Sequence, residues 1–204
     1  SCAMRPNSCS SNAAMSLQLL AFAVLPQLLV SDTEVQLPPP SSLTCSACLW
    51  SAKAFRSILV EKMPRRTKAK ERRRLAEESF ATVDSICAHR FPQQLVRVDA
   101  ELGRAKHLKI GYYDFADLRG DKASSLTSEH FEMLGTSDAA KEEVHYMCKT
   151  LSRAFPSAMV EKVASHKARI YSAITDFWLC VRQANLCTAE DAPPGGDEDE
   201  DEDL

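Results

Sequence analysis

From position 44 onward, hydrophobic residues recur every three to four positions, which is the spacing of one face of an α-helix. The pattern predicts four amphipathic helices over residues 44–62, 67–89, 137–154 and 157–185, the first with Thr44 as its N-cap. Their apolar faces carry, in chain order, Cys45, Cys48, Ala52, Phe55 and Leu59, then Ala76, Phe80, Val83 and Cys87, then Val144, Met147, Cys148, Leu151 and Phe155, and last Ile170, Ile174, Phe177 and Val181. We therefore predict an all-α bundle.

The helical pattern breaks between the second and the third predicted helix. Residues 91–136 are more polar and are punctuated by glycine, as in the segment GYYDFADLRG at 111–120. Because glycine lowers helix stability, we expect an irregular insertion here with one short helix. The fold would then be a bundle of four to five helices.

An apolar run, LQLLAFAVLPQLLV at 17–30, precedes the helices. It has about the length of the apolar core of a signal peptide and is too short to span a bilayer comfortably. A buried N-terminal helix is the alternative. The proline-rich linker QLPPPSS follows at 36–42. Cleavage before this linker would remove Cys2 and Cys9 and leave a domain at 43–188, with residues 1–42 as leader and linker.

Charge is distributed unevenly along the chain, which has 25 basic and 28 acidic residues and a formal net charge of −3. Seven of the acids form the run 197–203, so the rest of the chain has 25 basic and 21 acidic residues. A segment of this composition cannot bury enough apolar surface to fold, and we expect residues 189–204 to be a disordered acidic tail. The tail would solubilise the chain or, as an alternative, bind calcium weakly.

The predicted domain keeps six cysteines: Cys45, Cys48, Cys87, Cys148, Cys180 and Cys187. In a cytosolic protein they would suggest metal or redox chemistry, but behind a signal peptide they suggest a disulfide framework. Six cysteines allow 15 pairings. We choose the nested set, Cys45–Cys187, Cys48–Cys180 and Cys87–Cys148, because residues three apart on one helix face can meet two cysteines of an antiparallel partner. The other pairings remain open.

This cysteine arrangement resembles the saposin-like fold and, more closely, the canopy family of saposin-like proteins. The resemblance rests on CSAC at 45–48 after the proline-rich linker, DSIC at 84–87, YMC at 146–148 and LCVRQANLC at 179–187. It implies a saposin-like, disulfide-stapled bundle, and a resident of the endoplasmic reticulum lumen that assists the folding or export of secretory or membrane client proteins alongside lumenal chaperones. The residues DEDL at 201–204 differ from a KDEL-type retention signal in the first position and before the Leu, so secretion is the alternative.

Two other interpretations remain beside this one. The runner-up is lipid binding, in which pairs of saposin-like helices open and apply their apolar faces to a membrane surface. The long polar insertion argues against a compact lipid-binding saposin. The third makes Cys45 and Cys48 a redox pair at a helix start, but the sequence lacks the strand and helix alternation of a thioredoxin-like fold.

The sequence contains none of the catalytic motifs that we looked for. It has no nucleophile elbow, zinc-protease motif or phosphate-binding loop, so we predict no catalytic residue, metal site or cofactor, and we do not expect an enzyme. The basic run PRRTKAKERRR at 64–74 lacks interleaved aromatic residues, and we expect no nucleic-acid partner. We interpret it as a solvated helix surface. The alternative is docking of a protein partner through Arg65, Arg66, Arg72, Arg73 and Arg74.

Overall fold

The computed structural model describes residues 35–64, 67–82, 87, 90–106, 108–119, 138–166 and 172–191. The chain divides into two units, Ser1–Thr33 and Glu34–Leu204, and every described residue belongs to the second. The predicted signal segment at 17–30 and the acidic run at 197–203 therefore lie outside the described residues.

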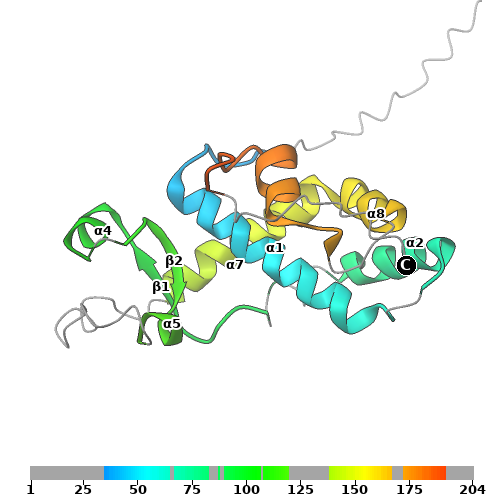
Figure 1. The fold of residues 1–204 in the computed structure, drawn as a ribbon, viewed down its shortest axis with the longest axis horizontal. Helices are drawn as coiled ribbons and strands as arrows, with labels where there is room; N and C mark the ends of the chain where they lie inside the picture. The colour runs from blue at the N-terminus through cyan, green and yellow to red at the C-terminus, as the bar shows by residue number, and fades with distance from the viewer. Residues whose placement is uncertain are drawn as a thin grey trace, which may run out of the picture. The chain divides into compact units, whose positions relative to one another are not determined.

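The second unit is mostly helical, as predicted, and has two short strands in addition (Figure 1). Its elements are α1 (Ser42–Lys62), α2 (Ala69–Ala81), β1 (Leu95–Val98), α4 (Ala100–Lys106), β2 (Gly111–Asp114), α5 (Phe115–Arg119), α7 (Asp138–Ala154), α8 (Pro156–Ser165) and the π-helix η3 (Phe177–Gln183). The bounds of α1 and α7 agree with the predicted helices to within two residues. No helix in the described ranges is long and apolar enough to cross a membrane.

The start of α1 differs from the prediction. Ser41, and not Thr44, is the N-cap: its hydroxyl accepts a hydrogen bond of 3.1 Å from the Thr44 amide, and the Thr44 hydroxyl accepts one of 2.8 Å from the Ser41 amide. This reciprocal pair is a capping box, which satisfies two amides that the first helical turn leaves without partners. The helix therefore begins at Ser42, inside the segment predicted as linker.

The second and fourth predicted helices are shorter than expected. α2 ends at Ala81, and Cys87 is again helical, while residues 83–86 and 88–89 lie outside the described part. The fourth helix is two elements, because α8 stops at Ser165 and His166 has extended backbone angles (φ −68°, ψ 125°). The hydroxyl of Thr175 then accepts a hydrogen bond of 3.0 Å from the Trp178 amide, so a new helical segment starts there.

The insertion predicted as irregular contains an antiparallel hairpin, and the all-α prediction was wrong at this point. β1 pairs with β2 in the register Leu95↔Asp114 to Val98↔Gly111. The strand LVRV buries every residue except Arg97, and its two β-branched residues, Val96 and Val98, lie on one buried face of the strand. Gly103 in α4 is needed because a Cβ there would lie 2.8 Å from the carbonyl oxygen of Leu108, in the turn leading to β2.

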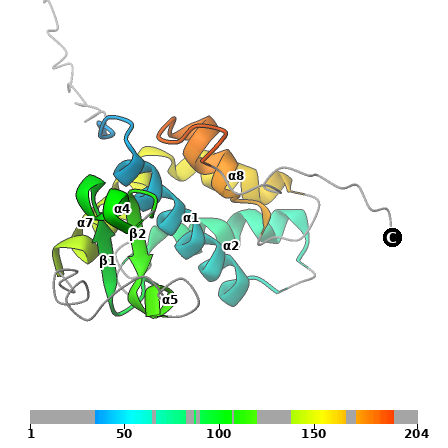
Figure 2. The same cartoon turned by 60° about the vertical axis from the view of Figure 1, so that its left-hand side comes forward.

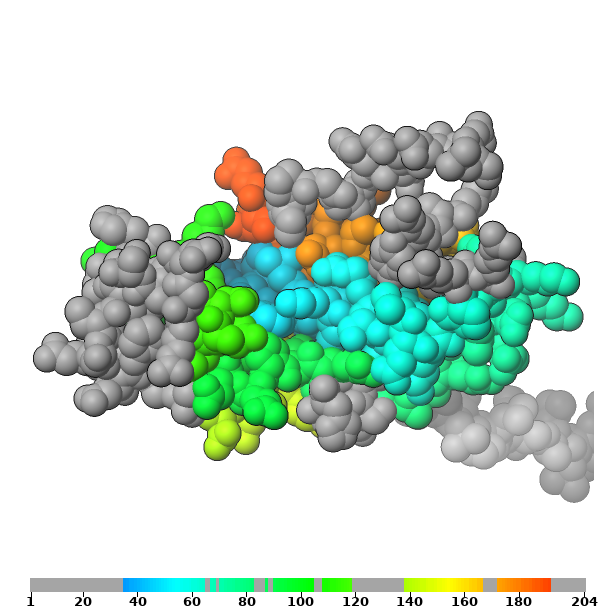
Figure 3. Space-filling view, turned by 60° about the horizontal axis from the view of Figure 1, so that its bottom comes forward, coloured from blue at the N-terminus to red at the C-terminus, as the bar shows by residue number. Residues whose placement is uncertain are grey.

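The core is built around α1, which packs against α7, α2, β2 and η3. Its side chains Phe55, Ile58 and Leu59 are each at most 1% exposed. Figure 2 shows the hairpin with α4 and α5 toward one end of α1, and α2 with α8 toward the other. In the space-filling view, α1 (blue to cyan) lies between the green residues around the strands and the orange residues near η3 (Figure 3).

Candidate binding groove

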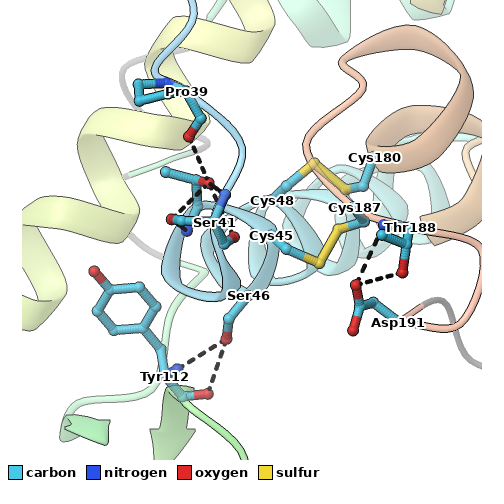
Figure 4. Close-up of a disulfide and its surroundings, with 11 residues drawn as sticks. Pro39, Ser41, Cys45, Ser46, Cys48, Tyr112, Cys180, Cys187, Thr188 and Asp191 are labelled. Carbon is cyan, nitrogen blue, oxygen red and sulfur yellow. Dashed lines mark hydrogen bonds between the residues drawn. A yellow bond between two sulfur atoms is a disulfide. The ribbon is translucent and has the colours of Figure 1, made fainter. Parts of the chain in front are cut away.

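Two disulfides join the start of α1 to the C-terminal end of the described chain (Figure 4). They are Cys45–Cys187 and Cys48–Cys180, with Cα–Cα distances of 4.8 and 5.8 Å. A further disulfide joins Cys87 to Cys148 on α7, with a Cα–Cα distance of 5.8 Å. These are the three nested pairs that we chose from the sequence.

The turn after η3 brings Cys187 beside Cys180. The amide of Leu186 donates a hydrogen bond of 2.9 Å to the Cys180 carbonyl, and the amide of Cys187 donates one of 3.1 Å to the same oxygen. Asn185, which directly precedes Leu186, has a φ of 51°, a left-handed conformation that asparagine adopts more readily than most residues. The spacing of the terminal cysteine pair is thus set by one π-helix and one left-handed turn.

The sulfurs of CSAC are bonded to Cys187 and Cys180 and not to each other. Cys48 is fully buried and Cys45 is 5% exposed, so neither is placed like the accessible thiol of a redox motif. The arrangement is that of a structural crosslink.

The hairpin is attached to α1 through the main chain of Tyr112. The hydroxyl of Ser46 accepts a hydrogen bond of 2.8 Å from the Tyr112 amide, and the indole of Trp50 donates one of 2.9 Å to the Tyr112 carbonyl (Figure 4 shows the Ser46 contact). Gly111 permits this approach, since a Cβ at that position would lie 2.8 Å from the Ser46 hydroxyl. Two side chains of α1 thus satisfy the outer edge of β2, which an isolated hairpin would leave unpaired.

An open groove of about 790 Å³ lies along the same side of α1. One wall is a stripe of α1 whose members are spaced by three or four residues and therefore share one face: Ser42, Ser46, Leu49, Lys53 and Arg56. The opposite wall comes from α4 and from residues 108–113, where the Tyr113 hydroxyl donates a hydrogen bond of 2.8 Å to the Lys109 carbonyl. Trp50, Leu108 and Ile110 add partly exposed apolar surface.

The charges that line the groove are nearly balanced: four side chains are basic (Lys53, Arg56, Arg104, Lys109) and three are acidic (Asp117, Asp176, Asp191). Lys53, Arg104 and Lys109 line it and are exposed, and none of them forms an ion pair with a carboxylate in the described part of the chain. The Lys53 ammonium lies 4.6 Å from the centroid of the Trp50 ring, a cation–π contact. Arg56 is the exception, because it forms an ion pair of 2.5 Å with Asp176.

Asp191 lines the groove at the last described residue of the chain. Its carboxylate accepts hydrogen bonds of 2.7 Å from the Thr188 hydroxyl and 3.2 Å from the Thr188 amide (Figure 4). These bonds, together with the smaller effect of the Lys109 charge, hold the pKa of Asp191 below its usual range. Residues 189–191 were predicted to be disordered, but they form a turn because of this contact.

A partly buried polar contact supports the hairpin from its other side. The Tyr112 hydroxyl donates a hydrogen bond to the carboxylate of Glu143 on α7, and the same carboxylate forms an ion pair of 3.0 Å with Arg97 on β1. Burial, and then the Glu143 carboxylate, raise the pKa of the Tyr112 phenol well above its usual value. The hairpin is therefore held between α1 and α7.

The basic run at 64–74, which we interpreted as a solvated surface with partner docking as the alternative, contributes no described residue to the lining of this groove. Arg65 and Arg66 lie outside the described residues. Arg72 is half-buried and donates hydrogen bonds to the carbonyls of Thr67 (2.7 Å) and His166. Arg73 pairs with Glu161, and Arg74 pairs with Glu78 one helical turn away. Docking of a partner on these arginines stays a prediction, but Arg72 has a structural role in joining α2 to the end of α8.

The groove residues were missed in the sequence because they belong to two segments that only the fold brings together. One wall could have been found from the sequence, because positions 42, 46, 49, 53 and 56 are spaced by three or four residues and so form a second face of the first helix, beside the face that carries the cysteines. Within the ranges that the structure describes, no group of three or more His, Cys, Asp or Glu side chains is placed to hold a metal ion.

No protein-family model, curated protein or solved structure matches this chain.

Proposed function

We propose that this protein is a folding assistant or adaptor of the endoplasmic reticulum, which holds a polypeptide segment of a secretory client or of a lumenal chaperone in the groove along α1. The three disulfides support the compartment, because such bonds persist in oxidising environments and are rare in the cytosol. The canopy-like cysteine pattern supports the role.

The groove is the observation that carries the proposal. Its lining combines apolar surface from Leu49 and Trp50 with main-chain groups and charged side chains of both signs, a mixture suited to an extended peptide and not to a small apolar ligand. Both walls are fixed in advance, one by the disulfides at Cys45 and Cys48 and the other by the bonds to Tyr112. A preformed groove loses less conformational entropy when a peptide binds.

A filling substitution tests this assignment. Ala100 is exposed at the start of α4 and lines the groove, whereas Ala116 is exposed near the start of α5 and does not. We expect the native protein to slow the aggregation of a chemically reduced secretory protein, measured by light scattering. Ala100→Trp should abolish that effect, and the matched control Ala116→Trp should keep it.

Equal behaviour of the two tryptophan variants would overturn the groove assignment. Sedimentation with liposomes made of phosphatidylcholine and phosphatidylserine tests the lipid-binding alternative. Pelleting of the protein with the liposomes, together with no effect on aggregation, would replace the folding-assistant proposal by the membrane one.

A further inference from the structure

The three disulfides differ in how closely a molecule in the groove can approach their sulfurs. In the bond Cys45–Cys187 the two cysteines are 5% and 7% exposed, whereas the four cysteines of the other two bonds are each 0% exposed. Cys45 also lines the groove, and it is the only one of the six bonded cysteines to do so. Because the rate of thiol–disulfide exchange depends on access to a sulfur, a thiol in the groove can reach Cys45–Cys187 before either of the others.

The same bond attaches one part of the groove wall to α1. Residues 188–191 follow Cys187 directly and form a turn whose last residue, Asp191, lines the groove. The described hydrogen bonds of this turn are internal: the Asp191 amide donates one of 3.1 Å to the Thr188 carbonyl, and the Asp191 carboxylate accepts two from Thr188. Since no described hydrogen bond or ion pair joins the turn to α1, the disulfide of Cys187 is its covalent attachment there (Figure 4).

Opening this one bond would leave the rest of the fold connected. Cys48 lies one helical turn further along α1 and stays bonded to Cys180 in η3. Cys187 follows Cys180 by seven residues, so the bond Cys48–Cys180 holds η3 against α1 but does not reach the turn that lines the groove.

We propose that Cys45–Cys187 is a redox-sensitive crosslink: a low-molecular-weight thiol that enters the groove reduces this bond and releases the turn 188–191, while the other two disulfides remain. The thiolate attacks Sγ of Cys45, the S–S bond breaks, and Cys187 leaves as a thiolate that takes a proton from water. A second thiol attacks the mixed disulfide and frees Cys45, which is protonated in the same way. Two protein thiols are thus formed, and two molecules of the small thiol are oxidised to their disulfide.

The consequence for a client rests on the proposed function, whereas the selective opening does not. A wall that is fixed in advance costs a bound peptide less conformational entropy than a wall that has to be ordered on binding. Release of the turn 188–191 removes this advantage. We therefore expect a client segment to bind the oxidised protein and to dissociate after reduction of Cys45–Cys187.

Timed reduction of the full-length protein tests the order of opening. The protein is incubated with dithiothreitol in native buffer, samples are alkylated with iodoacetamide at intervals, and mass spectrometry gives the labelled fraction of each cysteine. We expect Cys45 and Cys187 to be labelled at least about tenfold faster than the other four bonded cysteines, because fully buried sulfurs react only when the structure around them opens. Equal rates for all six, or earlier labelling of another bond, would refute the proposal.

A tryptophan variant tests whether the thiol arrives through the groove. Ser42 is exposed, lines the groove and lies one helical turn before Cys45 on α1. Ser157 is an exposed serine in the first turn of α8 that does not line the groove. We expect Ser42→Trp to slow the labelling of Cys45 several-fold and the matched control Ser157→Trp to keep the native rate. Equal labelling of Cys45 in these two variants would exclude the groove as the route of attack and would count against the proposal.

The full-length variant Cys45→Ser with Cys187→Ser tests the release of the turn. The amide of Leu186 donates a hydrogen bond to the Cys180 carbonyl and precedes the missing disulfide by one residue. Hydrogen exchange of this amide should be faster in the variant than in the native protein, while exchange in α7 should not change. Unchanged exchange at Leu186 would contradict release of the turn.

The aggregation assay, run with a client that has been reduced and alkylated beforehand, separates this proposal from the proposed function. The Cys45→Ser, Cys187→Ser variant should slow aggregation less than the native protein does, and an equal effect of both would refute control of client binding by this bond. If the native protein itself has no effect, the proposed function fails and the order of labelling still decides the redox-sensitive crosslink. If the native protein is effective but Cys45 and Cys187 are not labelled first, the crosslink proposal fails and the proposed function stands.

Discussion

The indole of Trp50 donates a hydrogen bond of 2.9 Å to the main-chain carbonyl of Tyr112, 62 residues away in the sequence. Ser46, one helical turn earlier, accepts from the amide of the same residue. Both polar groups of one main-chain unit are thus satisfied by a helix, in the way that a neighbouring strand would satisfy them. This contact positions the hairpin and so builds one wall of the groove.

Removing the hydroxyl of Ser46 should weaken the attachment of the hairpin. Ser46→Ala leaves the amide of the buried Tyr112 without its partner, which costs about 1 to 3 kcal/mol of unfolding free energy. Urea unfolding followed by circular dichroism measures the loss, and hydrogen exchange should show faster exchange of the Tyr112 amide. The matched control is Ser157→Ala, an exposed serine in the first turn of α8, which should change stability by less than about 0.5 kcal/mol. Unchanged exchange at Tyr112 would show that Ser46 does not hold the strand.

The helices could be predicted from the sequence because their signals are local. Cys148 and Leu151 lie on the buried face of α7 at the helical spacing that the sequence shows, and the nested cysteine pairs follow from helix faces that meet. The hairpin could not be predicted in the same way. Its strands have four residues each, and the edge of β2 is satisfied by Ser46 and Trp50 from a distant helix.

The division of the fourth helix was hidden for a related reason. The apolar spacing continues through Ile174 and Val181, so periodicity alone extends one helix across the whole segment. The structure ends α8 at Ser165 and starts η3 beyond Thr175, so that Cys180 and Cys187 can both reach α1. Each of these two disulfides joins cysteines more than 130 residues apart in the sequence, a long-range constraint that local periodicity does not reveal.

Stability at alkaline pH should depend on Tyr112. An unfolded tyrosine loses its proton near pH 10, whereas burial and the Glu143 carboxylate raise the pKa of this phenol in the folded chain. The folded state therefore binds the proton more tightly. The resulting stabilisation is complete below about pH 10 and declines as the pH rises above that value toward the folded pKa.

Comparison of variants measures this effect. Urea midpoints between about pH 9 and pH 11 should fall less steeply for Tyr112→Phe than for the native protein. Burial also raises the pKa of Tyr113, so some alkaline loss should persist in the variant. The control is Tyr146→Phe, which changes an exposed phenol on α7 (66% exposed) and should leave the native slope unchanged. An identical slope for Tyr112→Phe and the native protein would contradict the contact between the Tyr112 phenol and Glu143.

Arg72 should contribute more to stability than its neighbour Arg74. Arg72 is half-buried, and its guanidinium joins the carbonyls of Thr67 and His166, whereas Arg74 is exposed and pairs with the exposed Glu78. We expect Arg72→Ala to lower the unfolding free energy by about 1.5 to 3 kcal/mol, as for hydrogen bonds to charged groups. Arg74→Ala should lower it by less than about 0.5 kcal/mol. Arg72→Lys should recover only part of the loss, because an ammonium cannot reproduce the planar fork. Equal losses for Arg72→Ala and Arg74→Ala would place both arginines on a solvated surface.

The disulfides Cys45–Cys187 and Cys48–Cys180 should not contribute additively. They close loops of 142 and 132 residues that differ by only ten, because the two bonds lie side by side. While one bond is present, the other closes a ring of about ten residues, which the chain-entropy relation values at about 3 kcal/mol. Once one is gone, the remaining bond closes a much longer loop and is worth about 4 to 5 kcal/mol.

Serine pairs at 48 and 180, at 45 and 187, and at all four positions test this coupling. Each single removal should cost about 3 kcal/mol of unfolding free energy in urea, and removal of both bonds should cost about 7 to 8 kcal/mol, which exceeds twice the single loss. The control is removal of Cys87–Cys148, whose loop of 61 residues does not share this ring and whose loss should add to that of either single pair. If the loss of unfolding free energy on removing both bonds equals the sum of the two single losses, the two disulfides stabilise the protein independently. The start of α1 is then not held by the pair as one crosslink. A chain without either bond would have lost most of the stability of a typical domain, so it should also lose the groove, and its effect on client aggregation should disappear with the fold.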